Sequence, residues 1–533
     1  MRKTLLAIAA AAACSANMAA ADTTPTNVVL FTADDLGYEV FSLFTEGLPD
    51  LTPNMDKYAA QGVQFMHAHS NTSICMPSRS IMATGLYGIS SGMMGFMNLK
   101  DQSIPTVMGT LSDHGYRTGV LGKVSHSTPD LDYQWNYVQD YRELGAGRDP
   151  ELYYQFTKDF IAESKKNGQP FYLMVNSHDP HRAFHDPENP MRNGDIAKPS
   201  KLFSTDEVIV PEYLPDLPQT RLELSHYYNS VRRLDDTFGR VIEALDEKGV
   251  AEDTMVVFLS DNGSAFPFAK ANTYMFSSRT HFFVNWPNGD LKSGHVDDKN
   301  FISTVDIFPT ILDATGIDLD ASFDGETFLP LLRGEEQDNR EYVYTQIDYK
   351  IGGPATPMRA VQSEKYGYIF NPWSQEGANY RNSNEGEIIN AMLDSDDEAL
   401  HDRVTMFRER VVEEFYDLEK DPGSLNNLID HPEYQDVVNE YRDRLEQWME
   451  EHNDPVLPML AVSDNPRKLD RMMQRDYPKK NSLMPEAQLE KIRIKQEERR
   501  ARRNRNNQNN QGRQRLSEEE RRARRAANRA AQE

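Results

Sequence analysis

Residues Ser73 to Gly85 have the sequence SICMPSRSIMATG, with Cys75 near its start. The residues after Cys75, up to about Gly85, are expected to form a helix. The N-terminus of that helix would present backbone N–H groups and the positive end of its dipole to an anion. Taken by itself, the stretch fits equally well a free thiol in a proline-containing turn before a helix.

The cysteine content draws further attention to Cys75. The chain has 2 Cys, and the other, Cys14, lies in an N-terminal stretch that has a short basic start, an apolar run from Leu5 to Ala13 and then small residues. This pattern predicts a secretory signal peptide at residues 1–21. Once it is removed, Cys75 is the single cysteine of an exported chain, which indicates a reactive or modified residue.

The same stretch predicts a periplasmic or secreted location. Its apolar run is too short to cross a membrane as a helix, and no later run reaches that length, so no transmembrane segment is expected. Lipoprotein processing at Cys14 is the alternative, although the residues before it lack the large aliphatic side chain that such signals usually carry.

Size and composition predict a large folded domain with a smaller one beside it. The chain has 533 residues, of which 38% are hydrophobic and 10% aromatic. Its net charge is −25, although the segment from Glu490 to Glu533 carries 15 Lys and Arg against 7 Asp and Glu. Because an acidic body repels polyanions, an anionic substrate would need a locally cationic pocket or a bound metal.

Two predicted buried strands end in oxygen-rich pairs. Residues 27–31 lead to Asp34-Asp35, and residues 254–259 lead to Asp261-Asn262. Open α/β sheets bind ligands at the carboxyl ends of their strands. Adjacent carboxylates repel each other unless a cation lies between them, and Ca²⁺ prefers such ligands. The first pair alone would fit a turn with a helix N-cap equally well, but the two pairs together favour one shared site.

Two further segments carry histidine and lysine. Lys123 and His126 follow a short predicted strand, and residues 170–177 form another strand that leads into His178-Asp179-Pro180-His181-Arg182. A histidine suits general acid catalysis near neutral pH, especially beside an anion that raises its pKa. The alternatives are a surface Lys with a loop His, and a transition-metal site at His178, His181 and His185.

Together these motifs resemble those of the type I, formylglycine-dependent sulfatases. The resemblance implies that a maturation enzyme converts Cys75 to 3-oxoalanine (formylglycine), whose hydrate attacks the sulfur of a bound sulfate. It also implies a Ca²⁺ ion and a full set of site residues. The metal ligands implied are Asp34, Asp35, Cys75, Asp261 and Asn262; the catalytic residues are Cys75, Arg79, Lys123, His126, His178 and Lys270; the sugar-binding residues are His181 and Arg182.

The roles implied by the resemblance differ among these residues. Arg79 braces the aldehyde hydrate, Lys123 contacts a sulfate oxygen, and His126 hydrogen-bonds the hydroxyls of the nucleophile. His178 protonates the leaving oxygen or nitrogen, and Lys270 contacts the sulfate.

Within the family, the His-Asp-Pro-His-Arg segment resembles the sulfamidase (N-sulfoglucosamine sulfohydrolase) branch. Lys270 stands where that branch usually has Arg, and the loss of the forked guanidinium puts an identical specificity in doubt.

The resemblance implies an alkaline-phosphatase-like α/β sandwich, with a large mixed central sheet flanked by helices and a smaller α+β C-terminal domain. The expected units are the signal peptide (1–21), the catalytic domain (22–336), the small domain (337–464) and a basic, helical or disordered tail (465–533). Residues 227–248 are expected to form an amphipathic scaffold helix.

The expected function is that of an exported sulfatase that hydrolyses sulfate esters of a sulfated polysaccharide or oligosaccharide. The alternatives are an N-sulfoglucosamine sulfamidase, a phosphoester or phosphonate hydrolase of the same superfamily, and an inactive protein that binds sulfated glycans. The expected partners are the sulfated carbohydrate and the formylglycine-generating enzyme. No nucleic-acid partner is expected despite the basic tail.

Overall fold

The computed structural model describes residues 26–189, 197–350, 354–375, 377–382, 384–502, 520, 522 and 523. The predicted signal peptide, including Cys14, lies outside the described residues, as does most of the chain after residue 502. In the part of the chain described, no helix combines the length and the apolar composition that crossing a membrane requires.

The larger sheet has eight strands in the order β4-β3-β5-β1-β6-β7-β2-β8. Strand β1 pairs in parallel with β5 on one side and β6 on the other, and β7 runs antiparallel to both β6 and β2. The sheet is therefore mixed, as predicted. The strands are β1 (Asn27–Asp34), β2 (Val63–His69), β3 (Arg117–Leu121), β4 (Tyr137–Gln139), β5 (Phe171–Pro180), β6 (Thr254–Ser260), β7 (Arg279–Asn285) and β8 (His295–Ser303).

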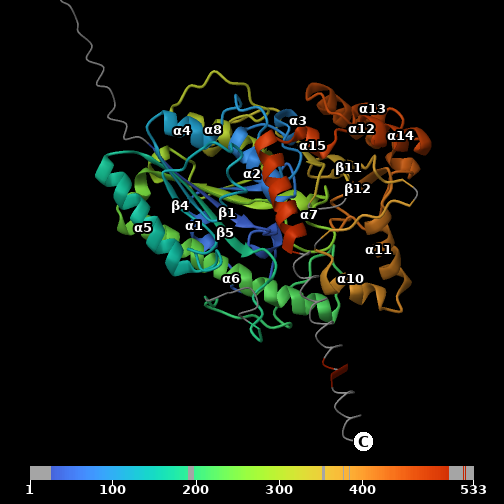
Figure 1. The fold of residues 1–533 in the computed structure, drawn as a ribbon, viewed down its shortest axis with the longest axis horizontal. Coiled ribbons are helices and arrows are strands. Elements are labelled where there is room, and N and C mark those ends of the chain that lie inside the picture. Colours follow the sequence, from blue (N-terminus) through green and yellow to red (C-terminus); the bar gives the residue numbers. More distant parts are fainter. Residues whose placement is uncertain are drawn as a thin grey trace, which may run out of the picture.

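Helices cover both faces of this sheet (Figure 1). Because successive side chains of a strand point to opposite faces, β1 contributes Val29 and Phe31 to one core and Val28 and Leu30 to the other. The first core lies under α5 (Pro150–Asn167) and α6 (Pro218–Glu247), and the second under α2 (Cys75–Thr84), α4 (Val107–Asp113) and α8 (Ile307–Thr315). The sandwich predicted from the sequence is confirmed.

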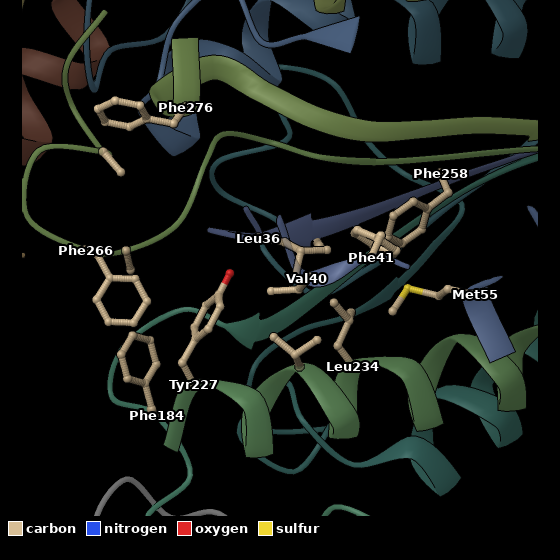
Figure 2. Packing of buried hydrophobic residues seen from close by; sticks show 14 of the residues in the cluster. Leu36, Val40, Phe41, Met55, Phe184, Tyr227, Leu234, Phe258, Phe266 and Phe276 are labelled. Atoms are coloured by element: carbon tan, nitrogen blue, oxygen red, sulfur yellow. The ribbon is translucent and has the colours of Figure 1, made fainter. Parts of the chain in front are cut away.

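Helix α6 carries much of the first core. Figure 2 shows Tyr227 and Leu234 of this helix packed near Val40, Phe41 and Phe258. The predicted scaffold helix is present, but it begins earlier in the chain than expected. The Tyr227 hydroxyl also accepts a hydrogen bond from the backbone N–H of Gly37, at 2.9 Å, and so reaches the loop that follows β1.

A smaller unit contains a four-stranded antiparallel sheet in the order β12-β11-β10-β9. Its strands are β9 (Val343–Ile347), β10 (Met358–Gln362), β11 (Tyr366–Phe370) and β12 (Glu413–Asp417), with α12 (Gln435–Glu451) packed on one face. Helices α10 (Gly386–Leu393) and α11 (Glu398–Glu409) lie between β11 and β12 in sequence. The α+β character expected for this unit is confirmed.

The first part of the predicted tail packs on the smaller unit. Helix α14 (Pro466–Asp476) supplies the buried Leu469, and Tyr477 and Met484 join the same hydrophobic cluster. The side chain of Gln488 accepts a hydrogen bond from the backbone N–H of Asn98, at 3.0 Å. Where the units begin and end stays a prediction.

The remaining helical elements are short. They are α1 (Pro53–Ala59), α3 (Gly88–Ser91), α7 (Met275–Ser278), α9 (Leu329–Leu332), α13 (Leu457–Leu460) and α15 (Lys480–Leu483), with single 3₁₀ turns η1 (Tyr38–Val40), η2 (Ala251–Asp253), η3 (Pro287–Gly289), η4 (Thr304–Asp306) and η5 (Pro432–Tyr434).

Candidate active site and metal centre

Three neighbouring parallel strands deliver the polar residues of the site. Asp34 ends β1, His178 lies near the end of β5, and Asp261 directly follows β6. Because β1 lies between β5 and β6, the carboxyl ends of all three strands meet at one edge of the sheet. Cys75 is the first residue of α2, so the N-terminus of this helix adjoins the same edge.

Asp34, Cys75 and Asp261 form a compact cluster. Each offers one ligand atom, these atoms lie within 4.8 Å of one another, and all three residues are buried. Asp35 has a φ of 69°, and its backbone N–H donates to Asp261 Oδ1 at 3.1 Å. The side-chain amide of Asn262 donates to Asp35 Oδ1 at 2.9 Å. The structure thus brings together all five predicted metal ligands.

The oxygen atoms of this cluster fit a hard cation. Within the described chain, both carboxylate oxygens of Asp34, one of Asp35 and the amide oxygen of Asn262 are buried and accept no hydrogen bond. Buried oxygens are normally hydrogen-bonded, and for Asp34 and Asp35 the charged side chains described below are partners by ion pairing only, so these oxygens keep capacity to bind a cation. A set made of carboxylate and amide oxygens is the kind that Ca²⁺ prefers.

Two lysines pair with these carboxylates. The ammonium of Lys123 forms an ion pair with Asp34, and that of Lys270 with Asp35. Lys270 Nζ also lies 3.0 Å from Cys75 Sγ. Although burial raises the pKa of Asp34, the cationic side chains around it, chiefly Lys123, outweigh this effect and hold that pKa well below its usual value.

The pKa values of the other two cluster members, Cys75 and Asp261, are shifted in the opposite direction, upward. Burial raises the pKa of the Cys75 thiol, and the Lys270 ammonium offsets this only in part. Burial also raises the pKa of Asp261, and the carboxylates of Asp34 and Asp35 add to this effect against the pull of Arg79. Both pKa values rise because additional negative charge in this cluster is unfavourable. A bound cation would make it less unfavourable.

Arg79 lies behind the cluster and is fully buried. It donates through Nε to Asp261 at 3.0 Å and through Nη1 to Thr32 and Asn176, each at 2.6 Å. Asn176 in turn accepts from the Thr32 hydroxyl at 2.7 Å. These contacts fix the orientation of the Asp261 carboxylate. The predicted contact of Arg79 with the nucleophile stays a prediction.

Two histidines line the site as neutral imidazoles. Burial, followed by the charge of Lys123, holds the pKa of His178 well below its usual value and lowers that of His126 to about 3. In each ring Nδ1 is buried and makes no hydrogen bond within the described chain. The ring of Tyr141 lies edge-on against that of His178, with centroids 5.3 Å apart. An anion beside His178 would counter the effect of Lys123.

The two predicted sugar-binding residues differ in their surroundings. His181 is partly exposed, and its Nε2 lies 3.7 Å from Asp35 Oδ2, close to the metal ligands. Arg182 forms an ion pair with Glu223, donates to the backbone carbonyl of Ala265 at 2.9 Å, and stacks over the ring of Phe184. Its guanidinium is thus already engaged within the protein. Sugar binding by either residue stays a prediction.

The sequence analysis missed the residues that hold the histidine segment in place. Arg233 of α6 donates to both carboxylate oxygens of Asp179, at 2.7 and 3.0 Å, and both side chains are fully buried. Arg148 donates to the backbone carbonyls of His181 and Ala183, at 2.8 and 3.1 Å. One signal was present in the sequence, since Arg233 lies among the apolar positions of an amphipathic helix.

Two protein-family models match parts of this chain. The model of the family described as "Sulfatase" matches residues 26–317, and that described as "N-sulphoglucosamine sulphohydrolase, C-terminal" matches residues 264–405.

Individual relatives agree with these matches. Human N-sulphoglucosamine sulphohydrolase is 27% identical over 468 residues, which cover 81% of this chain and 91% of the human protein. An ulvan-active sulfatase of Formosa agariphila is 24% identical, over 75% of this chain and 71% of that protein. A solved structure in complex with its substrate D-glucosamine-2-N,6-O-disulfate shares the fold, with a TM-score of 0.59 at 18% identity, over 81% of this chain and 99% of that one.

Proposed function

The chain belongs to the sulfatase family, within its sulfamidase-like branch, and from this premise we propose that it is an exported enzyme that removes sulfate groups from sulfated carbohydrates. The observation that carries the proposal is the convergence of Cys75, Lys123, Lys270 and the buried oxygen cluster at one edge of the sheet.

The substrate bond we favour is a sulfate ester of a polysaccharide or oligosaccharide. Similarity to ulvan-active sulfatases, which are named for a carbohydrate polymer, supports this choice. An N-sulfate is the second candidate, because the C-terminal family match and the human relative both carry the name of an N-sulfoglucosamine hydrolase. Lys270, in the place where that branch usually has Arg, is the reason for preferring the ester.

The proposed cofactors are Ca²⁺ and a modified Cys75. Asp34, Asp35, Asp261 and Asn262, with the modified residue, would hold the ion, and its charge would stabilise developing negative charge on the sulfate oxygens. Formylglycine at Cys75, in its hydrated form, would supply a hydroxyl as nucleophile and a second hydroxyl whose deprotonation allows sulfate to leave.

The protein's own side chains have distinct proposed roles. The ammoniums of Lys123 and Lys270 offset charge on the sulfate oxygens in a largely buried site, where such contacts are stronger than in water. His178 donates a proton to the leaving oxygen or nitrogen, and His126 accepts or donates a hydrogen bond at the nucleophile. Arg79 keeps the Asp261 carboxylate in position through its Nε contact.

The test begins with the mass of the peptide that contains Cys75, from protein made in its native host or together with a formylglycine-generating enzyme. We expect an aldehyde in place of the thiol, and sulfate release from a panel of O-sulfated and N-sulfated oligosaccharides that is lost in Cys75→Ala. An unmodified thiol in active protein would refute the proposal that formylglycine at Cys75 is the nucleophile. Faster turnover of an aryl phosphate than of an aryl sulfate would favour a phosphoester hydrolase.

A further inference from the structure

Lys350, which follows β9 in the smaller unit, lies close to the loop that carries Lys270. Its ammonium is 3.6 Å from the centroid of the Tyr380 ring. Tyr380 is fully buried, and its hydroxyl donates to the backbone carbonyl of Ala271. Asn382 contacts the same loop, because its side-chain amide donates to the backbone carbonyl of Lys270 at 3.2 Å. A single aromatic ring therefore separates Lys350 from the residue next to Lys270.

The segment of Lys350 also borders the opposite wall of the site. The backbone N–H of Tyr349 donates to the carbonyl of Met94 at 2.9 Å. Gly95 approaches so closely that an added Cβ would lie 2.7 Å from the Cβ of Tyr349. The next residue, Phe96, packs edge-on against the ring of His126, with centroids 5.6 Å apart. The segment of Tyr349 and Lys350 thus lies between Phe96, which packs on His126, and Tyr380, which contacts the loop that carries Lys270.

The charge of Lys350 distinguishes it from the other cations in this region. Arg182 pairs with Glu223, and Arg381 and Arg408 both pair with Glu385, each at 2.8 Å. No carboxylate of the described chain lies within 4.0 Å of the Lys350 ammonium. Within the described chain, Lys350 is therefore a cation that lies against an aromatic ring and forms no ion pair with a carboxylate.

Burial makes this arrangement costly for a charged group. Partial burial lowers the pKa of Lys350 to about 8, and the more distant Glu385 carboxylate opposes this effect only in part. A cation over a tyrosine ring gains some electrostatic attraction, but less than an ion pair supplies in the same setting. An anionic group of a ligand would restore the missing counter-charge.

We propose that Lys350 binds a second anionic group, a sulfate or a carboxylate, on the sugar whose reacting sulfate lies at Cys75. This inference rests on the proposed function and narrows it, because it selects carbohydrates with two negative groups over those with one. The smaller unit thereby contributes directly to substrate choice.

The experiment measures binding rather than turnover, so that it does not depend on maturation or on the reaction. Dissociation constants are determined by calorimetry with Ca²⁺ present, in the full chain carrying Cys75→Ala. The ligands are N-acetyl-D-glucosamine-6-O-sulfate, D-glucosamine-2-N,6-O-disulfate, and a disaccharide of N-acetyl-D-glucosamine-6-O-sulfate with glucuronic acid. The last two separate a second sulfate from a carboxylate as the group that Lys350 binds.

Three further substitutions are compared in that background. Lys350→Met removes the charge and keeps most of the length of the side chain, and Lys350→Arg keeps the charge. Lys365→Met is the matched control, because Lys365 also lies near a tyrosine ring of the smaller unit, 5.2 Å from the Tyr366 centroid, but it is half exposed and pairs with Glu419. Thermal unfolding checks that each variant is folded.

The expected result is that at least one of the doubly anionic sugars binds about ten- to a hundredfold more tightly than the monosulfated sugar, the range for one hydrogen bond to a charged group. Lys350→Met should abolish this preference, whereas Lys350→Arg and Lys365→Met should keep it. A preference that survives Lys350→Met, or no preference in the parent, would overturn the inference. Failure of the matured wild type to release sulfate from any sugar would instead overturn the proposed function.

Discussion

Removal of the proposed Ca²⁺ ion is expected to weaken the binding of sulfate itself, through Lys123 and Lys270. In the structure the ammoniums of Lys123 and Lys270 form ion pairs with Asp34 and Asp35. A cation bound by these carboxylates competes with the ammoniums for the same oxygens. Each ammonium then has donors available for a sulfate oxygen, so the ion and the anion should favour each other's binding.

The size of this effect follows from the contacts involved. A hydrogen bond to a charged group contributes about 1.5–3 kcal/mol. Because both ammoniums keep some attraction for the carboxylates, we take the lower limit for each, which gives about 3 kcal/mol, or roughly a hundredfold change in the dissociation constant of sulfate. Coupling between two ligands is reciprocal, so sulfate should tighten Ca²⁺ binding by the same factor.

The assay is a calorimetric titration of inorganic sulfate into the full chain at constant ionic strength, with saturating Ca²⁺ or with a chelator. Lys270→Met should reduce the coupling, because one of the two ammoniums is gone. Lys158→Met is the control, since Lys158 pairs with Glu247 on the outer surface at 2.7 Å. A dissociation constant for sulfate that does not change with Ca²⁺, or that falls when Ca²⁺ is removed, would refute the reasoning.

Three other expectations concern catalysis and stability. In the proposed mechanism the protonated form of His178 would be the acid, and burial and Lys123 depress its pKa, so kcat/KM should fall as pH rises from the acid side. Bound sulfate should raise this pKa, so kcat should fall only at higher pH. His178→Ala should lose both dependences in pH–rate profiles. Arg233→Met leaves Asp179 buried with its 3.4 Å ion pair to Arg148 but without its bidentate partner, and should cost about 3 kcal/mol in chemical unfolding, the lower end of the range for a broken buried pair. Arg221→Met, at a partly exposed arginine of the same helix, should unfold like the wild type. Tyr141 is 45% exposed beside the His178 ring, so Tyr141→Ala should raise KM for a sulfated oligosaccharide more than for an aryl sulfate, and equal changes would exclude a sugar contact.

The candidate metal ligands and catalytic residues could be predicted from the sequence because each lies in a short segment with a recognisable pattern. Asp34 ends one strand and Asp261 directly follows another, the apolar runs of both strands are visible in the sequence, and Cys75 begins a helix within its own motif. Parallel strand order then places these segments together without further information. The mixed sheet and the smaller α+β unit were expected correctly for a different reason, because the motifs resemble those of the sulfatase family.

The supporting contacts could not be predicted in this way. Arg79 is held by Thr32 and Asn176, which lie on different strands, and Asp179 by Arg233, from a helix expected to be scaffold only. Such pairs depend on which side chains of two distant segments meet, and neither segment carries a local signal for it.

The smaller unit contacts the loop that carries Lys270, although none of the predicted catalytic or metal-binding residues lies within it. Its Tyr380 and Asn382 donate to the loop at residues 270–271, and its Arg410 donates to the Asn272 side chain at 2.8 Å. On its other side, this loop is tied to the Cys75 segment, because Ser73 accepts a hydrogen bond from the Ala271 N–H at 2.9 Å. The position of the Lys270 ammonium therefore depends on both units at once. A chain ending at residue 336 would keep every motif residue, yet it would lose the contacts that hold Lys270 near Cys75, together with the cation of Lys350.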